Sequence, residues 1–140
     1  LSRNRFAICL RGIAKGAKGA ENLTSDVIVN ALRSGKESAY NAVMKPTEGT
    51  ILTVIRETSD KISEDFKKDS SVSPEELWTR VCTYAEESLA KTPEILPVLK
   101  TAGVVDAGGK GLLCIFEGMK SVFCDGKITV ENDKVYIKGE

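Results

Sequence analysis

One segment of the chain, residues 45–50 with the sequence KPTEGT, combines residue types that could bind an anion. Lys45 supplies a positive charge, Gly49 permits a tight backbone path, and Thr50 supplies a hydroxyl group where a helix is expected to begin. Free amides and the helix dipole both favour negative charge at a helix N-terminus. The same residues also suit an ordinary connection between two helices, so their spacing leaves both interpretations open.

A second segment, residues 106–111 with the sequence DAGGKG, also stands at an expected helix start. Its glycines would let a ligand approach the backbone closely, and Lys110 adds a positive charge. In the alternative interpretation Asp106 is only the N-cap of the last helix. The segment is not a phosphate loop of the G-x-x-x-x-G-K-[ST] kind, because the spacing differs and no Ser or Thr follows the lysine.

The composition excludes several other kinds of chemistry. The 140 residues include no histidine, which removes Ser-His and Cys-His pairs and imidazole metal sites. Twenty basic and twenty acidic residues cancel, so no broad basic face for nucleic acid is expected. No apolar run approaches the ~20 residues that cross a bilayer. With no signal peptide visible, we expect a cytoplasmic protein without a membrane span.

Carboxylates and cysteines yield neither a catalytic residue nor a metal ligand. No acidic cluster has the compact spacing of a metal-binding loop, and most carboxylates are predicted to lie on solvated helix faces. The carboxylates so interpreted are Glu57, Asp60, Glu64, Asp65, Glu75, Glu76, Glu86 and Glu87. The cysteines form no C-x-x-C pair, so buried reduced thiols are predicted. They are Cys9, Cys82, Cys114 and Cys124.

Apolar residues at spacings of three and four predict helices along most of the chain. The expected helices cover about residues 6–17, 25–44, 51–66 and 74–88, then a short one from Thr92-Pro93 and a last one from about residue 112. Ser73, Pro74 and Glu76 form the signature of a capping box. Residues 104–111 are predicted to be a glycine-rich connection. The fold class is therefore all-α, an antiparallel helical bundle of five or six helices.

The end of the chain changes period. Residues 127–130 and 135–137 alternate between apolar and polar side chains, which predicts a small β-hairpin. We interpret residues 1–124 as one helical domain and residues 125–140 as a hairpin or linker to a following domain, because an isolated hairpin is only marginally stable in water.

Two longer stretches resemble a known family. Residues 39–57, AYNAVMKPTEGTILTVIRE, resemble the middle of the nucleotide-binding domain of bacterial fatty-acid kinases, a domain related to the L subunit of dihydroxyacetone kinases. Residues 89–100, LAKTPEILPVLK, followed by residues 102–112, AGVVDAGGKGL, resemble a later part of the same domain. The resemblance covers about residues 7–123. It implies a barrel of about eight helices with ATP bound at one end.

The resemblance also implies a site and a reaction. In the whole family enzyme, ATP phosphorylates an acyl group that a separate fatty-acid-binding protein presents, with magnesium ions on the phosphates. In the dihydroxyacetone kinases the histidine that holds the substrate belongs to the partner, in agreement with the absence of histidine here. The residues that the resemblance places near the nucleotide are Lys45, Gly49, Thr50, Asp106, Ala107, Gly108 and Gly109.

The sequence departs from the family pattern in one respect. The family binds magnesium through a D-x-D-x-G-x-N motif and has a G-N-S-G phosphate loop, and neither motif is present; residues 1–6, LSRNRF, stand where the loop should end. Phosphoryl transfer depends on metal ions that neutralise the phosphates. We therefore expect an N-terminally truncated domain without useful kinase activity of its own. A bundle that lacks helices exposes apolar stripes, which predicts a homodimer.

Two interpretations of a different class remain beside the kinase fragment. In one, the chain is a non-enzymatic helical interaction module whose two glycine turns are only joints. In the other, it is a regulator that has lost catalysis and still docks a partner kinase subunit. The sequence does not indicate the phosphoryl acceptor.

Overall fold

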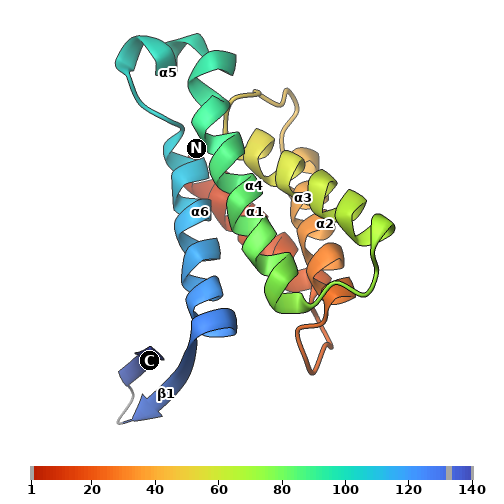
Figure 1. The fold of residues 1–140 in the computed structure, drawn as a ribbon. Coiled ribbons are helices and arrows are strands. Elements are labelled where there is room, and N and C mark those ends of the chain that lie inside the picture. The colour runs from red at the N-terminus through yellow and green to blue at the C-terminus, as the bar shows by residue number, and fades with distance from the viewer. Residues whose placement is uncertain (1, 132–133, 140) are drawn as a thin grey trace.

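The computed structural model describes the backbone of residues 2–131 and 134–139 and the side chains of residues 5–124. Helices α1 to α4 and α6 form a bundle, and the short α5 projects beyond one end of it between α4 and α6 (Figure 1), which confirms the predicted all-α fold. No helix in the described ranges is long and apolar enough to cross a bilayer. The elements are α1 (Ser2–Gly16), α2 (Ser25–Asn41), α3 (Ile51–Lys68), α4 (Pro74–Ile95), α5 (Pro97–Ala102), α6 (Ala107–Lys120), a π-helical turn η1 (Ser121–Asp125), β1 (Gly126–Glu131) and β2 (Lys134–Gly139).

Consecutive long helices run antiparallel, and small residues set the spacing of the first pair. A Cβ added at Gly12 of α1 would lie 2.7 Å from the Cβ of Ser38 in α2, and one added at Gly16 would lie 2.7 Å from the Cα of Ala31. Both distances are far shorter than ordinary carbon–carbon contacts. The two backbones therefore approach closely because glycine occupies α1 at these positions.

The core lies between α2, α3, α4 and α6. Leu52 and Ile55 on α3, Val81 on α4 and Leu112 on α6 are fully buried. Burying each of these side chains contributes roughly 1.5–3 kcal/mol. Trp78 is also part of the core. Its ring packs edge-on against Phe116 with centroids 5.5 Å apart, and its indole N–H donates to the Phe116 carbonyl at 2.9 Å.

The predicted start of α4 is confirmed, and the predicted helix start at Thr92-Pro93 is wrong. Ser73 Oγ accepts from the Glu76 amide at 3.1 Å with Pro74 in the first turn. Pro93 lies inside α4, which continues to Ile95. A proline there leaves the Leu89 carbonyl without its usual amide donor. The Thr92 hydroxyl donates to that carbonyl at 2.7 Å, so the helix does not break.

The glycine-rich connection is shorter than predicted. Helix α6 already begins at Ala107, so Gly108, Gly109 and Gly111 are helical. Helix α2 ends at Asn41, three residues before the predicted end. Alternation alone correctly predicted the hairpin: β1 and β2 pair antiparallel, with Ile128 opposite Ile137. In Figure 1 the hairpin follows α6 at the end opposite α5.

Candidate functional site

The side chain of Glu48 anchors the turn before α3. Its Oε2 accepts from the Tyr40 hydroxyl at 2.9 Å, and its Oε1 accepts from Arg56 Nη2 at 2.6 Å and from Thr53 Oγ1 at 3.0 Å. Arg56 Nε also donates to the Tyr40 oxygen at 3.0 Å. These four side chains form the Glu48 cluster. It ties the turn to both α2 and α3.

The charges in the Glu48 cluster stabilise each other. Burial by itself would raise the pKa of Glu48, but hydrogen bonds from Arg56, Tyr40 and Thr53 lower it below its usual value. The hydrogen bond to Glu48 raises the pKa of Arg56. Burial raises the pKa of Tyr40. The Glu48 carboxylate therefore stays ionised beside the turn, and the guanidinium neutralises its charge.

Gly49 and Thr50 have separate roles in that turn. Gly49 has φ 82°, a left-handed conformation that glycine adopts without strain. A Cβ there would lie 2.7 Å from the Cβ and 3.0 Å from the backbone nitrogen of Leu96, so the turn packs against the junction of α4 and α5. Thr50 is the N-cap of α3: its Oγ1 accepts from the Leu52 amide at 3.3 Å and donates to the Thr47 carbonyl at 2.6 Å.

Asp106 is the N-cap of α6, as the alternative interpretation of its segment predicted. Its Oδ2 accepts from the Gly109 amide at 2.9 Å. Its own amide donates to Thr92 Oγ1 at 3.2 Å, which joins the start of α6 to the end of α4. The Thr92 side chain is fully buried, so this polar link lies in the interior.

The two glycine-containing segments, the turn of residues 45–50 and the start of α6 at residues 106–111, lie more than fifty residues apart in the sequence and meet in the structure. We call them the two glycine turns. A Cβ at Gly108 would lie 3.4 Å from the Cβ of Ile51, the first residue of α3. One at Gly109 would lie 3.0 Å from Cγ2 of Val54. Helices α3 and α6 therefore run in the same direction here, and both N-termini open at the α5 end (Figure 1). Two helix dipoles present their positive ends there.

The remaining predicted site residues lie at the surface of this end. Lys45 and Ala107 are exposed, and so is Lys110. Among the side chains that the structure describes, no hydrogen bond or ion pair holds Lys45 or Lys110. The backbone turns are thus built into the fold, whereas the two lysines extend from it into solvent.

Sequence reasoning missed a surface pocket beside the Glu48 cluster. It has a volume of about 240 Å³ and lies between α2 and α3. Its lining residues are Lys36, Glu37, Tyr40, Asn41 and Arg56. The four lining residues on α2 lie at helical spacing, so the sequence could have indicated that they share one face of that helix. Arg56 joins them through tertiary packing, which no local pattern reveals.

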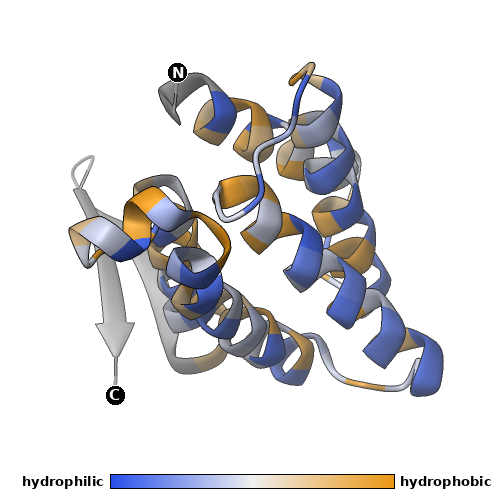
Figure 2. Ribbon diagram, turned by 90° about the horizontal axis from the view of Figure 1, so that it is seen from above, coloured by the Kyte–Doolittle hydropathy of each residue, from blue (hydrophilic) through white to orange (hydrophobic). Residues whose placement is uncertain are grey.

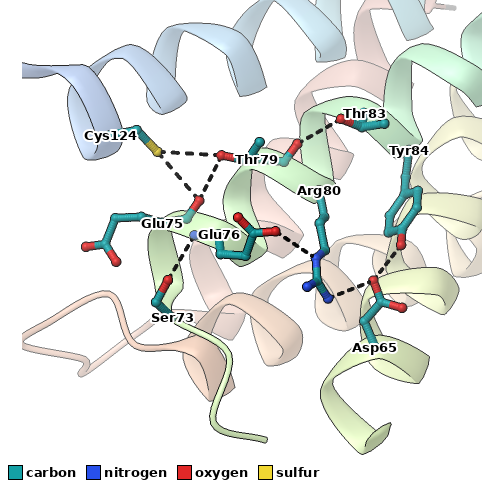
Figure 3. A network of polar contacts seen from close by, with 9 residues as sticks. All are labelled: Asp65, Ser73, Glu75, Glu76, Thr79, Arg80, Thr83, Tyr84 and Cys124. Carbon is teal, nitrogen blue, oxygen red and sulfur yellow. Dashed lines mark hydrogen bonds and ion pairs between the residues drawn. The ribbon is translucent and has the colours of Figure 1, made fainter. Parts of the chain in front are cut away.

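A second polar cluster joins the far ends of α3 and α4 (Figure 3). Asp65 accepts from the Tyr84 hydroxyl and pairs with Arg80 at 3.4 Å, and Arg80 also contacts Glu76 at 3.3 Å. The bond to Asp65 raises the pKa of Tyr84 to about 12. Asp65 was predicted to be simply solvated, which is wrong because the helical pattern cannot show that α4 packs beside it.

Another predicted surface carboxylate also has a partner. Glu57 accepts from the Ser88 hydroxyl at 2.5 Å, and Ser88 is fully buried. By contrast, Glu75, Glu76, Glu86 and Glu87 are exposed, as predicted. Over the described residues, no three Cys, Asp or Glu side chains are grouped so that they could hold a metal ion.

The cysteines divide into two classes. Cys9 and Cys82 are buried, and burial raises the pKa of Cys9 to about 12 and that of Cys82 to about 11. Cys114 is exposed on α6, which corrects the prediction that it is buried, and Cys124 is half-buried. Leu112, Leu113 and Phe116 form the buried face of α6. Cys114 lies on the opposite side of the helix, which explains its exposure.

Comparison with known proteins agrees with this architecture. The family model for the DAK2 domain matches residues 6–121. The chain is 46% identical over 108 residues to protein YloV of Bacillus subtilis, which covers 77% of the chain and 19% of YloV. It is 39% identical over 125 residues to an uncharacterized protein of Staphylococcus aureus strain USA300, covering 89% of the chain and 22% of that protein.

Fold and sequence together define a helical domain like the L subunit of dihydroxyacetone kinases. The chain belongs to the DAK2 domain family, as the resemblance in its sequence predicted. It spans about a fifth of the length of the curated relatives it matches.

Proposed function

We propose that this chain is the nucleotide-binding part of an ATP-dependent kinase of the dihydroxyacetone-kinase and fatty-acid-kinase type. The observation that supports it is the convergence of the two glycine turns at one end of the bundle, with Gly108 against Ile51. Two helix N-termini and a left-handed glycine at one place suit the phosphates of a nucleotide. Neither turn by itself would distinguish a binding site from a joint.

Each proposed residue has a part in this site. Thr50 and Asp106 cap their helices and hold the two turns in place. Gly49 lets the first turn pack closely against Leu96. Gly108 and Gly109 let the start of α6 pack closely against α3, which brings the two helix N-termini together. Lys45 and Lys110, free at the surface, would close over the phosphates and add positive charge. Arg56 neutralises Glu48, which otherwise would repel an anion bound beside it.

The residues present fit ATP better than they fit its magnesium ions. Magnesium takes carboxylate and phosphate oxygens, and within the described ranges no three carboxylates come together. The D-x-D-x-G-x-N motif is also absent from the sequence. We derive no step through magnesium from these residues, and we propose that phosphoryl transfer needs metal ligands from beyond this sequence.

The acceptor and its carrier are part of the same proposal. Phosphoryl transfer in the whole protein would use a fatty-acid-binding partner that presents the acyl group. The γ-phosphoryl group of ATP would pass to a carboxylate oxygen of the fatty acid, giving an acyl phosphate and ADP. A homodimer of the chain, with its exposed hydrophobic side chains covered by a second copy, is the proposed state of the isolated 140 residues.

Calorimetric titration with Mg-ATP tests the nucleotide proposal, on the protein extended N-terminally from Leu1 in its reading frame. We expect saturable binding that weakens about tenfold in Lys45→Ala and in Lys110→Ala, because each removes a charge-assisted contact to phosphate. Lys67→Ala, an exposed lysine at the last turn of α3, is the matched control and should bind as the unchanged protein does.

Absence of binding heat would contradict the proposal. It would favour the alternative, a non-enzymatic interaction or regulatory module in which the turns are only joints. One observation favours that alternative independently: Asp106, the acidic residue of the second turn, is fully engaged as an N-cap.

A further inference from the structure

The pocket between α2 and α3 is a second place where polar groups converge, apart from the two glycine turns. Its volume is about 240 Å³, and it is lined by Lys36, Glu37, Tyr40, Asn41 and Arg56. Hydrophobic and hydrophilic residues alternate along the helices of the bundle, as the colours of Figure 2 show, so each helix has a buried and an exposed side. The lining residues are exposed or half-buried, so the pocket opens at the surface, where a dissolved small molecule can reach it.

The positive side of the pocket has donors that the protein does not use. A guanidinium group has five N–H donors, and Arg56 uses Nε for the Tyr40 oxygen and Nη2 for Glu48 Oε1. Among the described residues, Nη1 of Arg56 donates no hydrogen bond. Lys36 uses one of its three N–H donors, toward Asp60 Oδ1 at 2.8 Å. The remaining donors of both cations can bind a carboxylate through charge-assisted hydrogen bonds.

The other side of the pocket carries acceptors. Glu37 and Asn41 lie one helical turn apart on α2, so their side chains are neighbours on its surface. Both are exposed, and within the part of the chain whose side chains are described neither makes a hydrogen bond or an ion pair. A carboxylate and an amide oxygen together suit an ammonium group, which has three donors and no acceptor.

This mixture of charges limits what can occupy the pocket. Lys36 and Arg56 are positive, whereas Glu37 and the paired carboxylates Glu48 and Asp60 are negative. A simple anion would have three carboxylates nearby, and a simple cation would have two positive side chains nearby. A ligand with both charges meets complementary groups on both sides. The pocket is also smaller than the roughly 300–1,000 Å³ of sites for drug-sized ligands, so the ligand is small.

We propose that this pocket binds a free α-amino acid with an apolar side chain. The carboxylate of the ligand would accept from Arg56 and Lys36, and its ammonium group would donate to Glu37 and Asn41. The wall of the pocket is mostly apolar, which matches an apolar side chain beside Tyr40. This proposal stands apart from the nucleotide proposal, because none of the lining residues belongs to the glycine turns.

Nuclear magnetic resonance of the isotope-labelled chain, titrated with L-leucine, tests the proposal. We expect saturable shifts of the backbone amide signals of residues 36–41 and of Arg56. The dissociation constant should be on the order of 1 mM, as for a ligand of few atoms in an open pocket. Two analogues each keep one charge: isocaproate lacks the ammonium group, and isoamylamine lacks the carboxylate. Each should bind about tenfold more weakly, because charge-assisted hydrogen bonds are lost.

Glu37→Gln tests the ammonium side of the pocket at nearly unchanged size. It should weaken the binding of L-leucine about tenfold. It should leave isocaproate binding at least as tight as before, because that analogue has no ammonium group. Glu86→Gln removes an equally exposed carboxylate on α4, outside the pocket. This matched control should bind L-leucine as the unchanged protein does.

Four results would each overturn the proposal. These are no saturable shift with L-leucine, shifts confined to residues outside α2 and α3, equal binding of L-leucine and either analogue, or equal binding of L-leucine by Glu37→Gln and the unchanged chain. The amide spectrum of each variant shows whether it is folded. The analogues are compared on the unchanged chain, so that comparison keeps the test if Glu37→Gln is not folded.

Discussion

Single residues decide how the turn before α3 is held. Gly49 has a left-handed φ and lies against Leu96, and Glu48 beside it accepts hydrogen bonds from three side chains. The turn therefore has a fixed geometry before any ligand binds. Such preorganisation lowers the entropic cost of binding.

Replacing Gly49 tests that geometry. Gly49→Ala should lower the free energy of unfolding by about 2–4 kcal/mol, because a Cβ adds left-handed strain and a clash with Leu96. Gly103→Ala is the matched control: φ is 69°, but nothing lies within 4 Å of the added Cβ. It should cost only about 1 kcal/mol. Urea unfolding of both variants gives the comparison, and equal losses would contradict close packing at Gly49.

The Glu48 cluster predicts a pH dependence. The folded-state pKa of Glu48 is lowered from 4.5, so its contribution to stability is present above pH 4.5 and is lost as the pH falls through the folded value. We expect Glu48→Gln to cost about 1 kcal/mol at pH 7 and to approach the stability of the unchanged protein as the pH falls through the lowered folded-state pKa of Glu48.

Urea unfolding at several pH values measures this convergence. The control is Glu86→Gln on α4, where the carboxylate is exposed, and it should change stability little at either pH. A constant difference between the unchanged protein and Glu48→Gln from pH 7 to pH 3 would show that the Arg56 pairing contributes nothing.

At the scale of elements, the junction of α4, α5 and α6 depends on one buried hydroxyl. Thr92 donates to the Leu89 carbonyl and accepts from the Asp106 amide, so it bridges a proline-containing helix end and the start of α6. The bridge helps to hold the start of α6 beside α4 and, together with helix packing, against α3. That position is what brings the second glycine turn to the first.

Thr92→Val tests the bridge with nearly unchanged shape. It leaves a buried carbonyl and a half-buried amide without partners, so we expect a loss of roughly 1–3 kcal/mol in the free energy of unfolding. Thr83→Val on the same helix also removes a hydroxyl that donates to a backbone carbonyl, at 3.2 Å, but its site is exposed. That variant should cost less than about 0.5 kcal/mol. Thermal or urea unfolding of both variants measures the two losses in the free energy of unfolding. Similar losses would contradict the predicted role of the Thr92 bridge.

At the scale of the whole molecule, the exposed hydrophobic side chains bear on whether the chain associates with itself. The large hydrophobic side chains of Met44, Ile95, Val98 and Val104 are exposed in the described structure, and a second copy of the chain would cover them. We predict a dimer of the isolated chain, with twice the 15.1 kDa mass in light scattering. A mass of one chain with a cooperative thermal transition would contradict this prediction.

Local chemistry alone was enough to predict much of this protein. Helical spacing predicted the all-α fold, and Ser73 and Pro74 marked the start of α4. The family came from a different source, the resemblance of residues 39–57 and 89–112 to known sequences, and the family model confirms it. These properties depend on neighbours within one or two helical turns, and a linear sequence displays such neighbours directly.

Only the tertiary structure decided how the turns relate to each other. The contact of Gly108 with Ile51, the pairing of Glu48 with Arg56 across a turn and the partner of Asp65 join helices whose relative rotation no spacing records. Pro93 shows the same limit: its helix continues because a hydroxyl replaces the missing donor. Whether an anionic ligand has a site here depends on such contacts, because a binding site is a property of packed helices and not of one segment.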